Sequence, residues 1–393
     1  MTPTRERALL WALLAGNFVI GTGVLMPAGM MNVLADAFGL PVTQVGRLVW
    51  AGAITMGLGA PLMAQLASPV DRRLLLVAAL GLYVGGHLAS ALCDTFEQLL
   101  VARIVTVVGA AIFTPQAAAA VSALLPPHRR SAGVTFAFLG WSLASAAGMP
   151  IGSLLGSAFG WRAAYGLEAA MALAAAAAVA LVMPARVVAP AVSFDTWRQV
   201  ARRAPLLLAL AVTVVQMAGQ FALSTYLAPE LRRKLGASPA AIAALFALYG
   251  ACGVAGSVVV ARLVLRVRPA QAVLVALALI GSGLLAWSVS GASVAIVVLA
   301  MVLWGLGGFA ANSLQQARLI DLAPALAPAS VALNSSGLYV GQAMGALAGA
   351  ALIGAHRPDW LAPAGALMLA AAIVVSMRVE RLVRRAVPGH APS

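Results

Sequence analysis

The chain alternates between long apolar stretches and short breaks that carry most of its charged residues. The apolar stretches reach the length of about 20 residues that a helix needs to cross a bilayer. They are too long and too uniformly apolar for barrel strands, whose side chains alternate over about ten residues. The pattern therefore predicts an all-α membrane protein with about twelve spans. The expected spans are 8–31, 43–67, 74–93, 98–124, 131–158, 162–184, 205–228, 239–264, 270–290, 292–322, 329–354 and 359–379.

Composition agrees with a chain whose solvent is lipid. Apolar residues make up 62% and charged residues 9%, with a mean hydropathy of +0.98, whereas about a quarter of a soluble domain is charged. The two cysteines, Cys93 and Cys252, are too few to suggest a disulfide or metal site. We find no nucleotide-binding glycine loop and no cluster with metal-ligand spacing. No enzyme activity, cofactor or metal is expected.

The net charge of +14 follows the membrane topology and does not indicate nucleic-acid binding. Arginines concentrate in alternate breaks, as the positive-inside rule requires. This distribution predicts that both termini lie in the cytoplasm. The cluster Arg232, Arg233 and Lys234 falls on the opposite side and is the one clear violation.

A ladder of small residues at every fourth position occurs twice. The first copy is Gly140, Ala144, Gly148, Gly152 and Gly156, and the second is Gly337, Gly341, Gly345 and Gly349, 197 residues further on. Such spacing allows close contact between helices. The repeat predicts an N-terminal six-helix bundle over 1–184, a cytoplasmic linker over 185–204 and a C-terminal six-helix bundle over 205–393. Two related halves with a site near the bilayer midplane are typical of secondary transporters.

The linker contains a short amphipathic segment. Phe194, Trp197, Val200 and Ala201 share one helical face, with arginines beside it. We interpret it as a helix lying on the anionic cytoplasmic leaflet. A solvated linker helix is the alternative.

The run Gly148-Met149-Pro150-Ile151-Gly152, followed by Gly160-Trp161-Arg162, resembles the antiporter motif of the bacterial drug:proton antiporter branch of the major facilitator superfamily. This branch includes arabinose- and sugar-efflux permeases. The resemblance implies the major facilitator fold in a bacterial inner membrane and export of a sugar, a nucleoside or a drug such as chloramphenicol. We assign Gly140, Gly148, Pro150, Gly152 and Gly156 to the motif; plain helix packing is the alternative.

The break after the second span is a degenerate copy of the family's loop motif, Gly-x-Leu-Ala-Asp-Arg-x-Gly-Arg-Arg. Arg72 and Arg73 keep the arginine pair, and Asp71 stands at the glycine position. Ser68 and Pro69 replace the acidic residue and the basic residue after it. The family's charge-relay gate is therefore not carried over, and a basic turn that fixes topology is the simpler interpretation.

Three ionisable residues are candidates for proton coupling. Arg103 lies inside the fourth span, where the family has an arginine linked to proton transfer, although the Gln-Gly that follows it there is absent. Glu168 and His87 are placed at a similar depth. Charges inside a span are costly unless they are paired or functional. We hypothesise a titratable cluster; the alternatives are that Glu168 pairs with Arg162 and that His87 is a packing residue.

Many members of this branch have an acid in the first span, but the run from Gly21 to Asn32 has none. Either another residue couples transport to protons, or the coupling to protons is weak, or it is absent. The second half contains no acid within a clear span and offers neutral polar groups instead. Either a mixed aromatic and neutral-polar pocket or interhelical hydrogen bonds would explain these candidates: Asn17, Trp141, Gln216, Gln220, Tyr226, Tyr249, Asn312, Gln316, Tyr339 and Gln342.

The sequence thus predicts a transporter that exports a small organic solute by alternating access, in exchange for protons. An importer or uniporter, a lipid flippase and a transport-dead sensor are the alternatives. The expected partners are a small-molecule substrate, protons and membrane lipids. We expect a monomer that does not bind nucleic acid.

Overall fold

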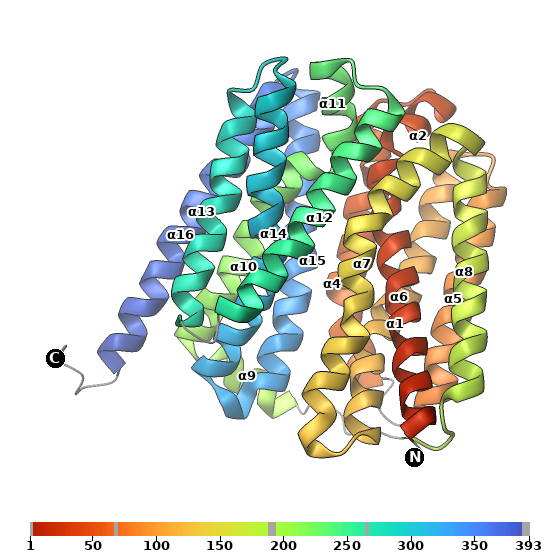
Figure 1. The fold of residues 1–393 in the computed structure, drawn as a ribbon, viewed down its shortest axis with the longest axis vertical. Coiled ribbons are helices and arrows are strands. Elements are labelled where there is room, and N and C mark those ends of the chain that lie inside the picture. The colour runs from red at the N-terminus through yellow and green to blue at the C-terminus, as the bar shows by residue number, and fades with distance from the viewer. Residues whose placement is uncertain (1–2, 67–69, 188–193, 264–266, 387–393) are drawn as a thin grey trace. The chain divides into compact units, whose positions relative to one another are not determined.

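The computed structural model describes residues 3–66, 70–187, 194–263 and 267–386, and the regular elements in these ranges are all helical (Figure 1). Eleven helices in the described ranges are long and apolar enough to cross a membrane. The predicted span 43–67 corresponds to α4 (Arg47–Leu66), which is not among the eleven. Ser68 and Pro69 of the loop motif lie outside the described residues. The all-α membrane class is confirmed, and the cytoplasmic location of the termini stays a prediction.

Spatial contacts divide the chain into two compact units. The first comprises Met1–Ala191 with Thr225–Gly250, and the second comprises Val192–Ser224 with Ala251–Ser393. The two six-helix bundles predicted over 1–184 and 205–393 were defined by the sequence duplication. Spatial contacts do not test that division, so it stays a prediction.

The first unit contains nine complete helices in its described part: α1 (Pro3–Gly29), α2 (Met31–Phe38), α3 (Val42–Val45), α4, α5 (Arg72–Leu92), α6 (Phe96–Leu124), α7 (Pro127–Phe159), α8 (Trp161–Val182) and α11 (Leu227–Leu235). Helix α12 (Pro239–Leu263) begins in the first unit and ends in the second. The described helices of the second unit are α9 (Phe194–Ala201), α10 (Ala204–Ser224), α13 (Pro269–Ser288), α14 (Val294–Leu322), α15 (Ala327–Gly354) and α16 (Leu361–Ala386), with short 3-10 turns η1 (Pro324–Leu326) and η2 (Pro358–Trp360).

Local sequence explains where the helices around the site begin. Thr95 and Gln98 form a capping box at the start of α6, in which each side chain accepts from the backbone of the other residue. Gly160 separates α7 from α8 with a φ of +83°, a conformation that glycine adopts without steric cost. These signals fix the turns that bring α5, α6, α7 and α8 together.

The first glycine ladder places α7 against the backbone of α1, beside which it runs in Figure 1. A Cβ at Gly148 would stand 3.2 Å from the Cα of Thr22, and one at Gly152 would stand 2.7 Å from the carbonyl oxygen of Met26. A side chain at Gly152 would force the two backbones apart, and one at Gly148 would press on α1. The predicted close helix contact is confirmed for the first copy.

The second ladder does the same in the second unit, where α15 packs on α10. A Cβ at Gly341 would meet the carbonyl oxygen of Val214, and one at Gly345 would meet that of Ala218. The two halves of the sequence repeat therefore build equivalent helix pairs, α1 with α7 and α10 with α15.

The amphipathic segment forms α9, and part of its apolar face packs against protein. Val200 is fully buried in a cluster with Leu206 of α10 and Leu319 of α14, and Trp197 packs against this cluster. Val200 therefore does not reach the leaflet, because the ends of α10 and α14 offer it an apolar surface, and the leaflet position of the helix stays a prediction.

The positive cluster that violates the topology rule is largely neutralised by acidic neighbours. Arg232 pairs with Asp36 of α2 at 2.9 Å, and Arg233 pairs with Glu230 at 2.8 Å, one helical turn away. Two of its three positive charges are therefore balanced within the first unit.

Candidate functional site

Arg103 is buried in the first unit, where its guanidinium binds the backbone of two other helices. It donates to the carbonyl oxygens of Gly23 at 2.8 Å and Val24 at 2.9 Å in α1, and to that of Leu48 in α4 at 3.4 Å. Two of its nitrogens thus hold consecutive carbonyls of α1. This planar set of donors is specific to arginine.

Gly23 is also the point where α5 and α8 approach α1. A Cβ there would collide with the hydroxyl of Tyr83 and would stand 2.8 Å from Nε2 of His87 and 2.9 Å from Oε1 of Glu168. The three residues proposed from the sequence, Arg103, His87 and Glu168, therefore meet at one glycine. A single bridging water can connect groups this close together.

His87 and Glu168 are 1% exposed. Neither ring nitrogen of His87 has a hydrogen-bond partner among the described residues, and no described side chain donates to either oxygen of Glu168. Buried polar groups left in this state are rare and call for an explanation.

Two tyrosines complete the cluster, and sequence reasoning missed both. The ring of Tyr83 contacts His87 edge-on at 4.5 Å between centroids, and that of Tyr165 stacks on His87 at 5.7 Å. Helical spacing could have indicated them. Tyr83 lies four residues before His87 and Tyr165 three before Glu168, so each tyrosine shares a helical face with its ionisable neighbour. The Tyr83 hydroxyl donates to the carbonyl oxygen of Ile20 at 2.9 Å, which fixes α5 to α1.

The alternative pairing of Glu168 with Arg162 is not formed. Arg162 instead donates to the carbonyl oxygen of Cys93 at 2.7 Å and lies 3.5 Å from a carboxylate oxygen of Asp94. It also covers the ring of Trp161, with 4.3 Å between its Cζ and the ring centroid. In the family-like Gly160-Trp161-Arg162 run, the arginine thus ties the start of α8 to the α5–α6 turn.

The loop motif is held together by hydrogen bonds to the carboxylate of Asp71. This carboxylate caps α5 by accepting from the backbone N–H of Arg73 at 2.7 Å, and it also accepts from the N–H of Arg186. Burial alone would raise the pKa of Asp71, but these backbone donors and the Arg73 charge outweigh it and hold the pKa below its ordinary value. Arg72 donates its backbone N–H to the carbonyl oxygen of Val187 at 2.9 Å. The loop therefore holds the chain that leaves α8.

The substrate candidates of the first unit mostly join helices. Asn17 donates to the carbonyl oxygen of Ala137 at 3.1 Å across the α1–α7 contact, and Trp141 donates to the Thr114 hydroxyl at 3.2 Å. The ring of Tyr226 packs on the backbone of Gly46. Tyr249 is buried as well.

In the second unit, Gln220 accepts from the indole of Trp304 at 3.0 Å. Asn312 accepts from Asn334 at 3.2 Å, and Asn334 itself accepts from Thr213 at 2.6 Å. This chain links α10, α14 and α15. The remaining candidates of this unit are buried or half-buried: Gln216, Gln316, Tyr339 and Gln342. Their role in substrate binding stays a prediction.

Arg318 lies within α14, inside the expected span 292–322, and is 2% exposed. Its guanidinium donates to the hydroxyl of Ser376 at 2.9 Å and to Glu380 at 3.2 Å, both on α16. Glu380 also lies within a helix long enough to span. It stands one residue past the end of the last predicted span at 379.

The Major Facilitator Superfamily profile matches residues 13–346 and 209–392. The chain belongs to the major facilitator superfamily. It is thus a multi-pass membrane transporter of a family whose members are not enzymes.

Several curated relatives of this superfamily member match most of its length. It is 32% identical over 390 residues to the chloramphenicol resistance protein of Streptomyces lividans, covering 97% of this chain and 98% of the relative. It is 27% identical to the inner membrane transport protein YdhP of Escherichia coli K12, with 88% and 89% coverage. Identity to a probable sugar efflux transporter of Mannheimia succiniciproducens is 27%, with 84% and 83% coverage.

Solved transporters share the fold at low identity. A bacterial homologue of the human lysosomal transporter Spinster aligns with a TM-score of 0.77 and 16% identity, over 97% of this chain and 98% of that one. A D-xylose–proton symporter aligns with a TM-score of 0.77 and 16% identity, over 94% and 96%. At this identity the likeness establishes the major facilitator fold alone.

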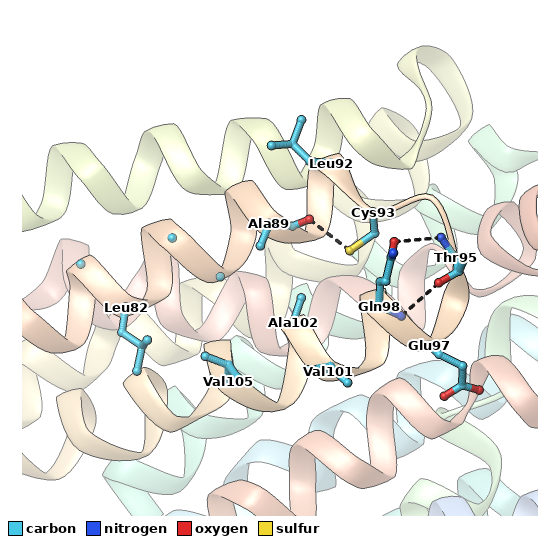
Figure 2. A pocket seen from close by; sticks show the side chains of 13 residues that line it. Leu82, Ala89, Leu92, Cys93, Thr95, Glu97, Gln98, Val101, Ala102 and Val105 are labelled. Atoms are coloured by element: carbon cyan, nitrogen blue, oxygen red, sulfur yellow. Dashed lines mark hydrogen bonds between the residues drawn. The ribbon is translucent and has the colours of Figure 1, made fainter.

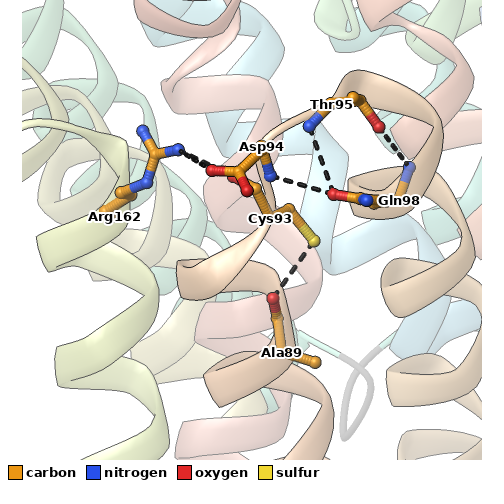
Figure 3. A network of polar contacts seen from close by, with 6 residues as sticks. All are labelled: Ala89, Cys93, Asp94, Thr95, Gln98 and Arg162. Atoms are coloured by element: carbon orange, nitrogen blue, oxygen red, sulfur yellow. Dashed lines mark hydrogen bonds and ion pairs between the residues drawn. The ribbon is translucent and has the colours of Figure 1, made fainter.

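A groove on this transporter has no residue of the ionisable cluster in its lining. It has a volume of about 810 Å³ and runs between α5 and α6 (Figure 2). Apolar side chains and glycines line most of it, and Thr95, Glu97 and Gln98 lie at one end, where Figure 3 shows the capping box of Thr95 and Gln98. None of the proposed substrate-binding residues takes part.

Proposed function

We propose that this chain exports a small organic solute of the drug, sugar or nucleoside type by alternating access in a bacterial inner membrane, in exchange for protons. The run from Gly148 to Gly152 supports export, because it resembles the antiporter motif and packs α7 on α1. The relatives named as a chloramphenicol resistance protein and as probable sugar efflux transporters agree with this direction.

The observation that carries proton exchange is the meeting of Glu168, His87 and Arg103 at Gly23. Ionisable residues inside membrane spans mark proton relays when they face the bundle interior. A proton added to or removed from Glu168 changes the charge next to the backbone that Arg103 holds. Protonation then favours one position of α1 over another, and a transporter requires such a bias between two states.

The solute itself is expected to be neutral or amphipathic. The polar candidates on α10, α14 and α15 are amides and phenols, such as Gln216 and Tyr339, which offer hydrogen bonds without charge. Sites with this lining orient a ligand through a few hydrogen bonds while apolar contacts provide most of the area.

An importer or uniporter is the second candidate, because the stretch of α1 from Gly21 to Gly29 has no acid. The direction of the driving gradient separates the candidates. Antiport predicts uptake into proteoliposomes that have an acidic lumen, symport predicts uptake with acid outside, and a uniporter responds to neither.

The test uses the full-length protein in proteoliposomes with radiolabelled chloramphenicol and a panel of labelled sugars. Glu168→Gln should abolish gradient-driven uptake of the transported probe while leaving exchange without a gradient. Glu6→Gln is the matched control, because Glu6 is also a buried carboxylate but pairs with Arg129 at 2.9 Å, outside the cluster. Undiminished proton-driven uptake by Glu168→Gln would contradict the proposed coupling. Flipping of a fluorescent lipid in the same vesicles would instead indicate a flippase.

A further inference from the structure

A chain of three polar side chains crosses the second unit from α10 through α15 to α14. The hydroxyl of Thr213 donates to Oδ1 of Asn334 at 2.6 Å, and Nδ2 of Asn334 donates to Oδ1 of Asn312 at 3.2 Å. Thr213 and Asn334 are fully buried, whereas Asn312 is half-buried. Because polar groups in spanning helices face the bundle interior or a cavity, the open side of Asn312 points there and not toward lipid.

Amide chemistry alone does not fix the direction of this hydrogen-bonded chain. An amide offers an acceptor oxygen on one side and two donors on the other, and a hydroxyl can donate or accept. If all three groups were reversed, Thr213 would accept and Asn312 would present its oxygen to the interior. The direction is therefore decided at the buried end of the chain, by the acceptor to which the hydroxyl of Thr213 donates its hydrogen.

The carbonyl oxygen of Ala209 settles this direction. A threonine hydroxyl inside a helix can donate to the carbonyl four residues earlier, which for Thr213 is that of Ala209. This oxygen has two lone pairs, and both are occupied, because it accepts from the backbone N–H of Thr213 within α10 and from Nε2 of Gln315 on α14. The hydroxyl of Thr213 therefore donates to Asn334, which turns its own Nδ2 toward Asn312.

The direction of the chain leaves Nδ2 of Asn312 as its open end, with no acceptor among the residues that the structure describes. We propose that Thr213 and Asn334 are positioning residues that hold this donor toward the transported solute. The site then selects uncharged solutes that present an acceptor oxygen to α14, such as that of a carbonyl, nitro or hydroxyl group. It rejects an ammonium group at this point, because donors facing donors leave both without a partner. The inference rests on the proposed function, since it requires a solute that reaches Asn312.

Gln216 lies one turn after Thr213 on α10 and provides a contrast. Its side chain is 2% exposed, and its amide oxygen has no partner in the described part of the chain. No described neighbour fixes the direction of this amide, so it can offer a solute either an oxygen or an N–H. The polarity of Asn312 is fixed before the solute arrives. Asn312 therefore discriminates between donors and acceptors, and Gln216 does not.

The first experiment measures equilibrium binding of radiolabelled chloramphenicol and of labelled sugars to the purified full-length protein at pH 8, without a gradient. Asn312→Asp keeps an oxygen that accepts from Asn334 but replaces the open donor with a second acceptor. We expect this variant to bind the transported probe at least about tenfold more weakly than the wild type does. Asn32→Asp on α2 is the matched control and should bind normally, because Asn32 is also half-buried but lies outside the polar chain.

Thr213→Val tests the positioning role, because valine keeps the shape of the side chain and removes its hydroxyl. Binding should weaken about threefold, and Thr213→Ser, which restores the hydroxyl, should bind like the wild type. The losses in Thr213→Val and Asn312→Asp should not add, since both act through one chain. Unchanged binding in either variant would overturn the proposal.

Melting temperatures separate an error in the direction of the chain from a failure of the proposed function, because they need no solute. In the inferred direction, the carboxylate of Asn312→Asp still accepts from Asn334, so this variant should melt above Asn312→Leu, which has no acceptor. In the reverse direction, the carboxylate would face the oxygen of Asn334 and the variant would melt below Asn312→Leu, which would overturn the proposal. A wild type that binds no probe while the first order of melting holds would count against the proposed solute and support the direction of the chain.

Discussion

Nη1 of Arg103 donates to the carbonyl oxygen of Gly23 at 2.8 Å, across the contact between α6 and α1. The Cα of the same glycine faces Glu168 and His87. The carbonyl oxygen of Gly23 therefore contacts the positive charge of Arg103. Because Gly23 has no side chain, the titratable groups can approach its Cα on the other side. In the proposed mechanism, this residue transmits the protonation state to α1.

Gly23→Ala should damage both stability and coupling. Its Cβ would overlap the hydroxyl of Tyr83 and push against Nε2 of His87, and overpacking of this kind costs about 1–3 kcal/mol. We expect a lower melting temperature in detergent and loss of proton-driven uptake. Gly166→Ala should change neither, because its Cβ meets nothing within 4 Å.

A partial rescue makes this prediction specific. Glu168→Asp shortens the acidic side chain and withdraws one of the three groups that crowd position 23. Gly23→Ala combined with Glu168→Asp should be more stable than the sum of the single changes predicts. Additive effects would show that the carboxylate does not contact position 23.

Pro150→Ala tests whether the ladder of α7 does more than pack. Pro150 lies inside a continuous helix, and alanine restores the N–H that proline lacks. If the motif directs export, uptake into acid-loaded vesicles should fall about tenfold, which is about 1.4 kcal/mol in the barrier, with folding retained. Pro115→Ala in α6 is the control, because Pro115 is also inside a helix but outside the motif. Unchanged export by Pro150→Ala would reduce the ladder to helix packing.

Asp71 should make a pH-dependent contribution to stability. Since its pKa is lowered in the folded state, the contribution is complete above the unfolded value of about 3.9 and is lost as the pH falls through the folded value. Asp71→Ala should cost about 1 kcal/mol at pH 7 through loss of the helix cap.

Thermal unfolding across pH 3–7 checks this, with Asp71→Asn as the control that keeps a capping oxygen without the charge. The difference between wild type and Asp71→Ala should shrink toward the acid end. For Asp71→Asn, the cost at pH 7 should be smaller. A cost that is independent of pH would contradict the role given to the carboxylate.

The order of residues was enough to predict several features of the fold. Helices such as α10 follow from apolar runs, because lipid requires each segment to satisfy its own backbone. The small residues at Gly148, Gly152, Gly341 and Gly345 foretold close helix pairs, since their spacing matches one helical face. The similar distance of Arg103 and Glu168 from the ends of their spans also predicted that the two residues lie at the same depth in the bilayer.

Other features depend on how helices rotate about their axes and which of them are neighbours, and no local pattern encodes that. Sequence alone did not decide whether Glu168 pairs with Arg162 or joins the cluster of Arg103 and His87. Only the packing of α5 and α8 on α1 placed it at Gly23, because that glycine has no side chain to hold it away. Likewise, Arg318 acquired its partner Glu380 from a helix 62 residues further along the chain. Sequence determined the helices and their small-residue contacts, whereas tertiary packing decided which buried charges meet.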